Sequence, residues 1–258
     1  MACDGSVWPV MGQYGLWLKE TCDWACLFIV WNPAVMRGCV NNIETRPRRI
    51  HRASAWGSLY GKRMGNGIAH CTCAYFYITL LRDPMSRYLS EWRHQRLGQH
   101  CKDAKLQCDG KRVELFDIRP CFYDTWHGVS LDEFMECRDN LAVNRQTRMI
   151  ADVTKSKCYY RRGITPEKRT EAQLESAKQN LQQMPFFGLT ERQTETQHMF
   201  EKTFGRKFKT SFTYLNDAEE EDMISEDEFV HLMQHIELDM QLYLYAAELF
   251  KEKLRTVI

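Results

Sequence analysis

The chain has 258 residues, enough for one large domain or two small ones with a proper hydrophobic core. Its 35 basic and 34 acidic side chains give a net charge of +1, so its overall charge indicates neither a nucleic-acid nor a membrane partner. The apolar run from Leu27 to Trp31 is far too short to span a bilayer. These numbers are ordinary for a globular protein, and they leave its function to local patterns.

The cysteines are the most unusual feature of the composition. Eleven lie between Cys3 and Cys158, which favours an oxidising, secretory compartment and leaves at least one of them unpaired. No signal peptide follows Met1, and the chain has no Asn-x-Ser/Thr glycosylation acceptor. These observations conflict, and a natural N-terminus longer than this one would reconcile them.

The composition and periodicity of the sequence change at Tyr75. Residues 1–74 are rich in Trp, Gly, Cys and Arg and show no sustained periodicity of 2.0 or 3.6 residues. An apolar, β-rich run, predicted to be a central strand, then spans residues 75–81. Asp83 can cap a following helix, Pro84 suits its first turn, and we expect this helix to end near Leu97. We therefore predict a poorly patterned segment over 1–74 and an ordered domain over 75–258.

Helix signals alternate with one further strand in the rest of the chain. The capping box at Ser130 predicts a helical region through about residue 152, broken near 138–139. A helix opened by Thr165 should end at Pro185 and be followed by a buried strand over 186–189. Thr190 should cap the next helix, and a capping box at Ser225 should open one long final helix. Strands separated by helices predict the α/β class, with a parallel sheet flanked by helices.

Residues that could bind a ligand lie at the end of the first predicted strand. In open α/β sheets, ligands bind at the carboxyl ends of the strands, where Arg82 lies. An arginine fork with the hydroxyl of Ser90 suits a terminal phosphate. Ser90 and His94 share one helix face, so His94 should lie one turn further along. In the alternative interpretation, Arg82 pairs with Asp83 or Glu91 and Ser90 is an ordinary surface serine. Tyr88 and Trp92 are predicted to be core residues rather than a stacking platform.

The segment YITLLRDPMSRYLSEWRH, residues 77–94, resembles the 3′-phosphate-binding strand–loop–helix of heparan sulfate 6-O-sulfotransferases. Six later segments resemble that family in its own order and spacing: SLDEFMEC, NLAVNRQTRMIAD, LESAKQNL, FFGLTE, FEKTF and LDMQLYLYA. The similarity runs from about Tyr75 to the C-terminus. It implies a P-loop-like sulfotransferase fold and transfer of a sulfuryl group from 3′-phosphoadenosine 5′-phosphosulfate to the 6-hydroxyl of glucosamine in heparan sulfate.

The resemblance also implies roles for particular residues. Arg82 and Ser90 would bind the 3′-phosphate of the donor, and His94 would contact the sugar acceptor. A loop that closes over the donor, partly through its backbone, corresponds to Thr213, Tyr214 and Leu215. Heparan sulfate would be the partner, with no nucleic acid and no metal. The expected location is the lumenal side of the Golgi membrane, reached through an anchor that is absent from this chain.

The resemblance also bears on the cysteines. Family cysteine positions match Cys108, Cys121, Cys137 and Cys158, which favours disulfides for some of them. The alternative is a zinc site built from four of the other cysteines and a histidine, namely Cys22, Cys26, His70, Cys71 and Cys73. Their spacing fits no regular zinc pattern, so we expect no metal.

The chain departs from the family pattern in its first part. The family's Lys-Thr-Gly-Gly-type loop for the 5′-phosphosulfate, with the strand before it, has no counterpart, and the glycine-rich stretch over 57–67 has the wrong spacing. The family's general-base histidine is missing from the context around Asp23-Trp24, and since nothing aligns His51 or His70 with it, the catalytic base is unknown.

Two smaller departures affect binding. Cys101 replaces a sugar-holding tryptophan, and Ala218-Glu219 replaces a Thr-Arg pair beside the donor. Three interpretations follow: an active sulfotransferase, a truncated inactive member that at most binds heparan sulfate or nucleotide, and an unrelated nucleotide-binding α/β protein.

Overall fold

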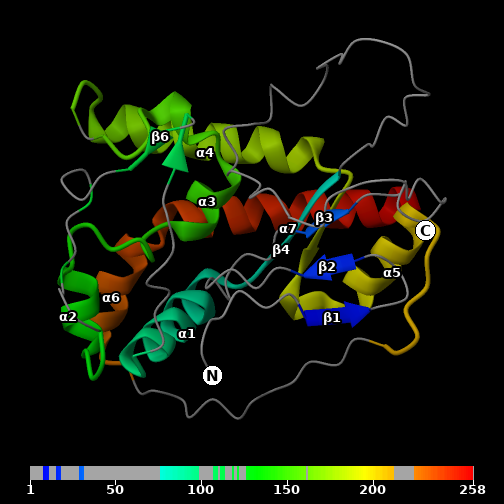
Figure 1. The fold of residues 1–258 in the computed structure, drawn as a ribbon, viewed down its shortest axis with the longest axis horizontal. Helices are drawn as coiled ribbons and strands as arrows, with labels where there is room; N and C mark the ends of the chain where they lie inside the picture. The colour runs from blue at the N-terminus through cyan, green and yellow to red at the C-terminus, as the bar shows by residue number, and fades with distance from the viewer. Residues whose placement is uncertain are drawn as a thin grey trace.

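The structure is a computed structural model of the whole chain. It describes residues 8–11, 16–18, 29–31, 76–98, 107–109, 111–113, 118, 121, 126–160, 162–211 and 224–257. Within these ranges a small central sheet is surrounded by helices, as Figure 1 shows. The α/β class is therefore confirmed.

The central sheet has the order β3-β4-β7, formed by Ile29–Trp31, Phe76–Leu81 and Phe186–Leu189. The two strands predicted from sequence, β4 and β7, pair in parallel, with Ile78 opposite Phe186 and Leu81 opposite Leu189. The edge strand β3 pairs antiparallel with β4, so the sheet is mixed rather than wholly parallel. Because β3 comes from the segment over 1–74, that segment supplies backbone partners to one edge of β4.

Two further strand pairs are short and antiparallel. The first joins β1 (Trp8–Met11) to β2 (Leu16–Leu18) in the part of the chain where the sequence predicted no strands. The second joins β5 (Gln107–Cys108) to β6 (Lys111–Arg112). Strands β2, β5 and β6 have only two or three residues, too few to show a period, and β1 contains Pro9, which does not suit a strand interior, so none of them was predicted.

The helix after β4 begins and ends as predicted. Helix α1 spans Pro84–Arg96, and the Asp83 side chain accepts a hydrogen bond from the Ser86 N–H at 2.8 Å. The predicted helical region after Ser130 forms α2 (Leu131–Glu136), α3 (Arg145–Ile150) and the 3₁₀ turn η3 (Val153–Ser156). The Ser130 capping box is present, and the break between α2 and α3 includes the predicted position.

The later helices differ from prediction in two places. Helix α4 (Pro166–Gln183) starts as expected, but Thr190 begins a 3₁₀ turn, η4 (Thr190–Arg192), and α5 (Gln193–Phe204) follows it. The Thr190 hydroxyl donates to Glu191 at 2.8 Å, so it does not cap the helix. The final helix was predicted as one and is two, α6 (Glu226–His235) and α7 (Glu237–Val257).

The break at Ile236 has a cause in a distant part of the chain. The Asn144 side-chain oxygen accepts hydrogen bonds from the N–H groups of Leu238 at 2.9 Å and Asp239 at 3.2 Å, which gives α7 its own N-terminal cap. The Asn144 N–H in turn donates to the His235 carbonyl at 3.0 Å. One asparagine therefore satisfies the end of α6 and the start of α7.

In the described part of the chain, apolar side chains form two core clusters. The first lies around the parallel strands, where all four residues of β7 are buried, as expected for a strand covered on both faces. Helices α4 and α7 lie side by side over this cluster (Figure 1), and α5 packs against β7. The second cluster packs α1 against α2 and α6 through Tyr88, Trp92, Phe134 and Leu232. Of the helices in the described ranges, none is long and apolar enough to cross a membrane.

Candidate functional site

The candidate site lies where the two parallel strands end. Strand β4 ends at Leu81 beside Leu189, the last residue of β7, so both carboxyl ends meet at one edge of the sheet. The half-buried Arg82 follows β4 directly, and the N-terminus of α1 begins two residues later. An arginine and a helix N-terminus at this edge are the features that favour an anionic ligand.

Helix α1 places the other predicted residues in the expected order. Ser90 and His94 are half-buried, whereas Tyr88 and Trp92 are buried in the second core cluster. The Trp92 indole N–H donates to the Val129 carbonyl at 3.0 Å, so this ring is a core residue as predicted. Burial lowers the pKa of His94, so its imidazole is neutral at neutral pH and can donate one hydrogen bond and accept another.

Both carboxylates that the alternative interpretation gave to Arg82 have other partners. The Asp83 carboxylate accepts from the Ser86 N–H, and the two oxygens of Glu91 lie 2.6 Å from Arg87 and 3.4 Å from Arg145. Asp83 therefore caps helix α1, and Glu91 pairs with one arginine of α1 and one of α3.

One arginine of helix α1 is buried, although arginine side chains are mostly exposed. Arg87 is only 1 % exposed. Its guanidinium binds Glu91, lies 3.6 Å from Asp239 and donates to the Ala142 carbonyl at 2.8 Å. It is therefore a core ion-pair residue, because a buried guanidinium needs its charge and donors satisfied by the protein.

The backbone around Arg82 is held by side chains that sequence analysis did not select. Gln146 of α3 accepts from the Arg82 N–H at 2.9 Å and donates to the Arg82 carbonyl at 2.8 Å. Glu191 of η4 accepts from the Asp83 N–H at 2.7 Å and from the Tyr243 hydroxyl of α7 at 2.7 Å. Burial, with a smaller effect of the bond to Glu191, raises the pKa of Tyr243, so its phenol stays protonated and donates.

Several predicted site residues lie outside the described residues. These are Thr213, Tyr214 and Leu215 of the expected donor loop, with Ala218 and Glu219, Cys101, the glycine-rich stretch over 57–67 and the histidines His51 and His70. Their roles stay predictions. The proposed zinc alternative also lies outside, and the described part of the chain has no group of three or more His, Cys, Asp or Glu that could hold a metal ion.

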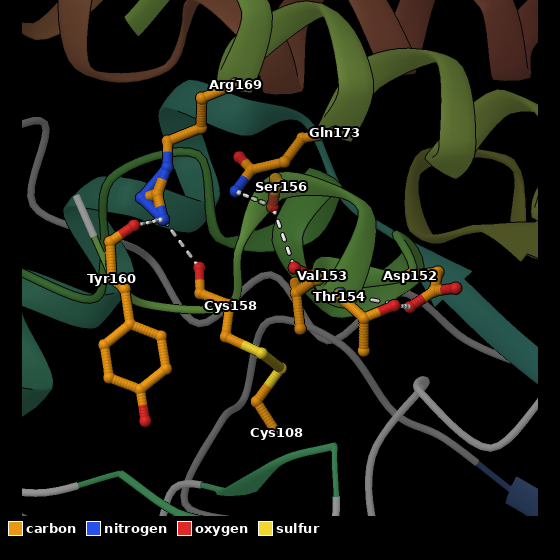
Figure 2. The surroundings of a disulfide bond; sticks show 9 residues. All are labelled: Cys108, Asp152, Val153, Thr154, Ser156, Cys158, Tyr160, Arg169 and Gln173. Carbon is orange, nitrogen blue, oxygen red and sulfur yellow. Dashed lines mark hydrogen bonds between the residues drawn. A yellow bond between two sulfur atoms is a disulfide. The ribbon is translucent and has the colours of Figure 1, made fainter. Parts of the chain in front are cut away.

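The cysteines predicted to form disulfides do so. Cys108 pairs with Cys158 across 50 residues, and Cys121 pairs with Cys137 across 16. Figure 2 shows that the first bond ties β5 to the turn after η3, where the Arg169 guanidinium donates to the carbonyls of Cys158 at 2.7 Å and Tyr160 at 2.9 Å. This disulfide therefore fixes a loop that α4 also holds.

Comparison with known proteins decides the family. The model of the sulfotransferase family matches residues 37–246. The chain belongs to the sulfotransferase family. It is 47% identical over 181 residues to heparan-sulfate 6-O-sulfotransferase 1 of Cricetulus griseus, covering 69% of this chain and 45% of that protein. It is 46% identical over 181 residues to heparan-sulfate 6-O-sulfotransferase 1 of Homo sapiens, covering 69% and 44%.

A further relative is heparan-sulfate 6-O-sulfotransferase 3 of Mus musculus, 46% identical over 184 residues, or 69% of this chain and 38% of that protein. The resemblance drawn from residues 77–94 and the later segments is therefore confirmed, and with it the sulfotransferase fold. The chain spans less than half the length of these curated relatives. The boundary placed at Tyr75 stays a prediction.

Proposed function

We propose that this sulfotransferase moves a sulfuryl group from 3′-phosphoadenosine 5′-phosphosulfate to the 6-hydroxyl of glucosamine residues in heparan sulfate. The observation that supports the proposal is the position of Arg82, which follows the carboxyl end of the parallel strands and precedes α1, the helix that carries Ser90. The names of the relatives supply the acceptor and the position on it.

The donor would be held by its 3′-phosphate. A guanidinium can give that phosphate two parallel charge-assisted hydrogen bonds, and the Ser90 hydroxyl can give a third. The backbone of Thr213, Tyr214 and Leu215 would close over the donor. Transfer needs in-line attack by the sugar oxygen on sulfur, with cations that stabilise the charge developing on the leaving bisphosphate.

The acceptor would lie further along α1. His94 is one helical turn beyond Ser90, and a neutral imidazole suits hydrogen bonds with sugar hydroxyls. We name no general base. Heparan sulfate is the only macromolecular partner that we propose, with no nucleic acid. The disulfides Cys108–Cys158 and Cys121–Cys137 favour an oxidising compartment, which agrees with the lumenal side of the Golgi membrane. Attachment to that membrane would be through an anchor.

A second candidate is a family member that binds nucleotide or heparan sulfate without transferring sulfate. It is favoured by the sequence over 1–74, in which neither the 5′-phosphosulfate loop nor the family's catalytic histidine can be identified. A glutamate at position 219, where the family has an arginine, would also weaken donor binding by repulsion.

The experiment that tests the proposal is calorimetric titration of the full chain with 3′-phosphoadenosine 5′-phosphate. Loss of a charge-assisted bidentate contact costs about 2–3 kcal/mol, so Arg82→Ala should weaken binding by about 30- to 150-fold. Arg96→Ala is the matched control, because Arg96 lies on the same helix but is exposed and stacks on Trp92. Equal affinity in wild type and Arg82→Ala would refute the phosphate site.

A second assay separates the two candidate functions. Wild-type protein that binds the nucleotide is incubated with the sulfated donor and N-sulfated heparosan, and the disaccharides are analysed for 6-O-sulfate. New 6-O-sulfate that Arg82→Ala abolishes supports the enzyme. Nucleotide binding without any transfer supports the inactive binding protein.

A further inference from the structure

One side chain holds both polar groups of the Arg82 main chain. The Gln146 amide oxygen accepts from the Arg82 N–H at 2.9 Å, and its amide nitrogen donates to the Arg82 carbonyl at 2.8 Å. Arg82 lies one residue beyond the last residue of β4, where the ladder to β7 has ended. The side-chain amide therefore takes the place of a neighbouring strand, since both backbone groups need a partner once removed from water.

Gln146 is itself fixed in position. It is only 1 % exposed, and its own N–H donates to the buried Asp239 carboxylate of α7 at 3.2 Å. The next residue, Thr147, donates to the same carboxylate through its N–H at 2.7 Å and its hydroxyl at 2.8 Å. Because α3 is anchored in this way, the Gln146 amide reaches Arg82 from a rigid base.

The segment is held from the other side as well. The Asp83 N–H donates to Glu191, which follows β7 and also accepts from Tyr243 of α7. Arg82 and Asp83 are therefore clamped between α3 and the end of β7. This clamp sets the direction in which the Arg82 side chain leaves the main chain.

We infer that Gln146 is a positioning residue for the donor phosphate site, acting through Arg82; the inference rests on the function proposed above. A guanidinium whose backbone is already fixed loses less conformational entropy when it binds a phosphate. An amide is the chemistry required here, because the Arg82 peptide presents one donor and one acceptor. A carboxylate would repel the carbonyl, and an apolar side chain would leave both groups unpaired in the protein interior.

Amide hydrogen exchange of the ligand-free protein tests the clamp directly. Gln146→Met keeps the shape of the side chain and removes both hydrogen bonds, and Gln146→Glu removes only the donor. The matched control is Asn180→Leu, because Asn180 is a buried amide that donates to the Ile150 carbonyl at 2.7 Å, at the other end of α3. The Arg82 N–H should exchange at least about tenfold faster in Gln146→Met and be unchanged in Asn180→Leu.

A double-mutant cycle on nucleotide affinity tests the functional role. Gln146→Met should weaken binding of 3′-phosphoadenosine 5′-phosphate by about tenfold, in the lower range of effects for residues that orient a ligand-binding group. In an Arg82→Ala background the same change should have no further effect, because Gln146 acts only through Arg82. A purely structural role would instead give the same loss in both backgrounds, and a similar loss in Asn180→Leu.

The outcomes separate the inference from the proposed function. Unchanged exchange of the Arg82 N–H, or additive losses in the cycle, would overturn the role of Gln146 while the phosphate site stands. Wild-type protein that binds no nucleotide would overturn the proposed function and the donor role together, whereas the exchange rates would still show whether Gln146 holds Arg82. If Gln146→Met does not fold, Gln146→Glu gives the same comparison with one bond retained.

Discussion

Asp239 is the residue whose replacement should reveal how the site is supported. Its carboxylate is fully buried on α7 and accepts three hydrogen bonds from the start of α3, one from Gln146 and two from Thr147. It also lies 3.6 Å from the buried guanidinium of Arg87 on α1. One side chain thus joins α7 to α3 and α1, the helices next to the candidate site.

The cost of removing this carboxylate can be estimated from those contacts. Asp239→Ala leaves the N–H groups of Gln146 and Thr147 and the Thr147 hydroxyl unpaired, and each buried unpaired group costs about 1–3 kcal/mol. It also removes a carboxylate beside Arg87, and breaking a buried ion pair costs about 3–5 kcal/mol. Since these contributions overlap, we expect a loss of about 4 kcal/mol, a large share of the roughly 5–15 kcal/mol of a typical domain.

Asp239→Asn should lower the free energy of unfolding by less, about 2–3 kcal/mol. The asparagine side chain keeps one acceptor oxygen, but its NH2 group would face a backbone N–H of α3, where two donors meet. The measurement is urea unfolding followed by circular dichroism, under non-reducing conditions that keep the disulfide bonds intact. Glu237→Gln is the matched control, an equal loss of charge at an exposed position two residues earlier, and it should stay within about 0.5 kcal/mol. Wild-type stability in Asp239→Asn would refute the reasoning.

Three further changes have results that the structure predicts. In Gly188→Ala the new Cβ would lie 2.3 Å from the Thr196 side chain, so the protein should lose about 2–3 kcal/mol of unfolding free energy in urea. Replacing both Cys108 and Cys158 by serine should cost about 4 kcal/mol for the loop that they close, measured in the same way. Burial lowers the pKa of His94 in the folded protein, so below about pH 6.5 the unfolded protein binds a proton at His94 more readily than the folded one, and the free energy of unfolding falls. His94→Gln should make the free energy of unfolding depend less on pH between about pH 7 and 5.

Each of these has a result that would contradict it. Gly188→Ala at wild-type stability would mean that β7 and α5 can separate without cost. Replacing the shorter disulfide, Cys121 with Cys137, should cost about 3 kcal/mol, so a larger loss there than at the longer one would contradict the loop argument. For His94, an unchanged slope in the variant would assign the acid sensitivity to other groups.

Local signals predicted the elements well where the cause lies within a few residues. The capping boxes at Ser130 and Ser225 and the Asp83-Pro84 start each place a helix where the structure has one. The two strands of the parallel pair were found from short apolar runs bounded by turn and helix signals. At the helix starts the partner of the capping side chain is three residues away, and the strands show as runs of apolar residues, so both signals are visible in the sequence.

The features that sequence analysis did not predict have causes far away in the chain. The split between α6 and α7 depends on Asn144, and the burial of Arg87 depends on Asp239 and on the Ala142 carbonyl. A sequence window around Ile236 or Arg87 contains none of these partners. Long-range hydrogen bonds decide such positions, and periodicity cannot show them.

The positions of three predicted site residues at the strand end and on α1 followed from the sequence, and their roles stay predictions; the residues that hold the Arg82 backbone were not predicted. Arg82, Ser90 and His94 follow from strand-end and helix spacing, whereas Gln146 lies in a polar stretch that suggests a surface helix. One signal could have been used: Asp239 falls on the apolar face of α7, three residues before the buried Leu242. A carboxylate among core positions needs partners, so it indicates a buried polar network.

The buried network implies that stability and nucleotide affinity are linked by one path, from Asp239 to α3, to Gln146 and then to Arg82. Asp239→Asn should therefore weaken binding of 3′-phosphoadenosine 5′-phosphate even at low temperature without urea, where the variant is fully folded. Global unfolding cannot explain such a loss, because a folded population above 95 % changes the apparent affinity by only about 5 %. Replacement of Cys121 and Cys137 by serine, with a similar expected loss of stability at residues that are not part of this path, is the control. If both variants bind the nucleotide as the wild type does, the network supports the fold alone.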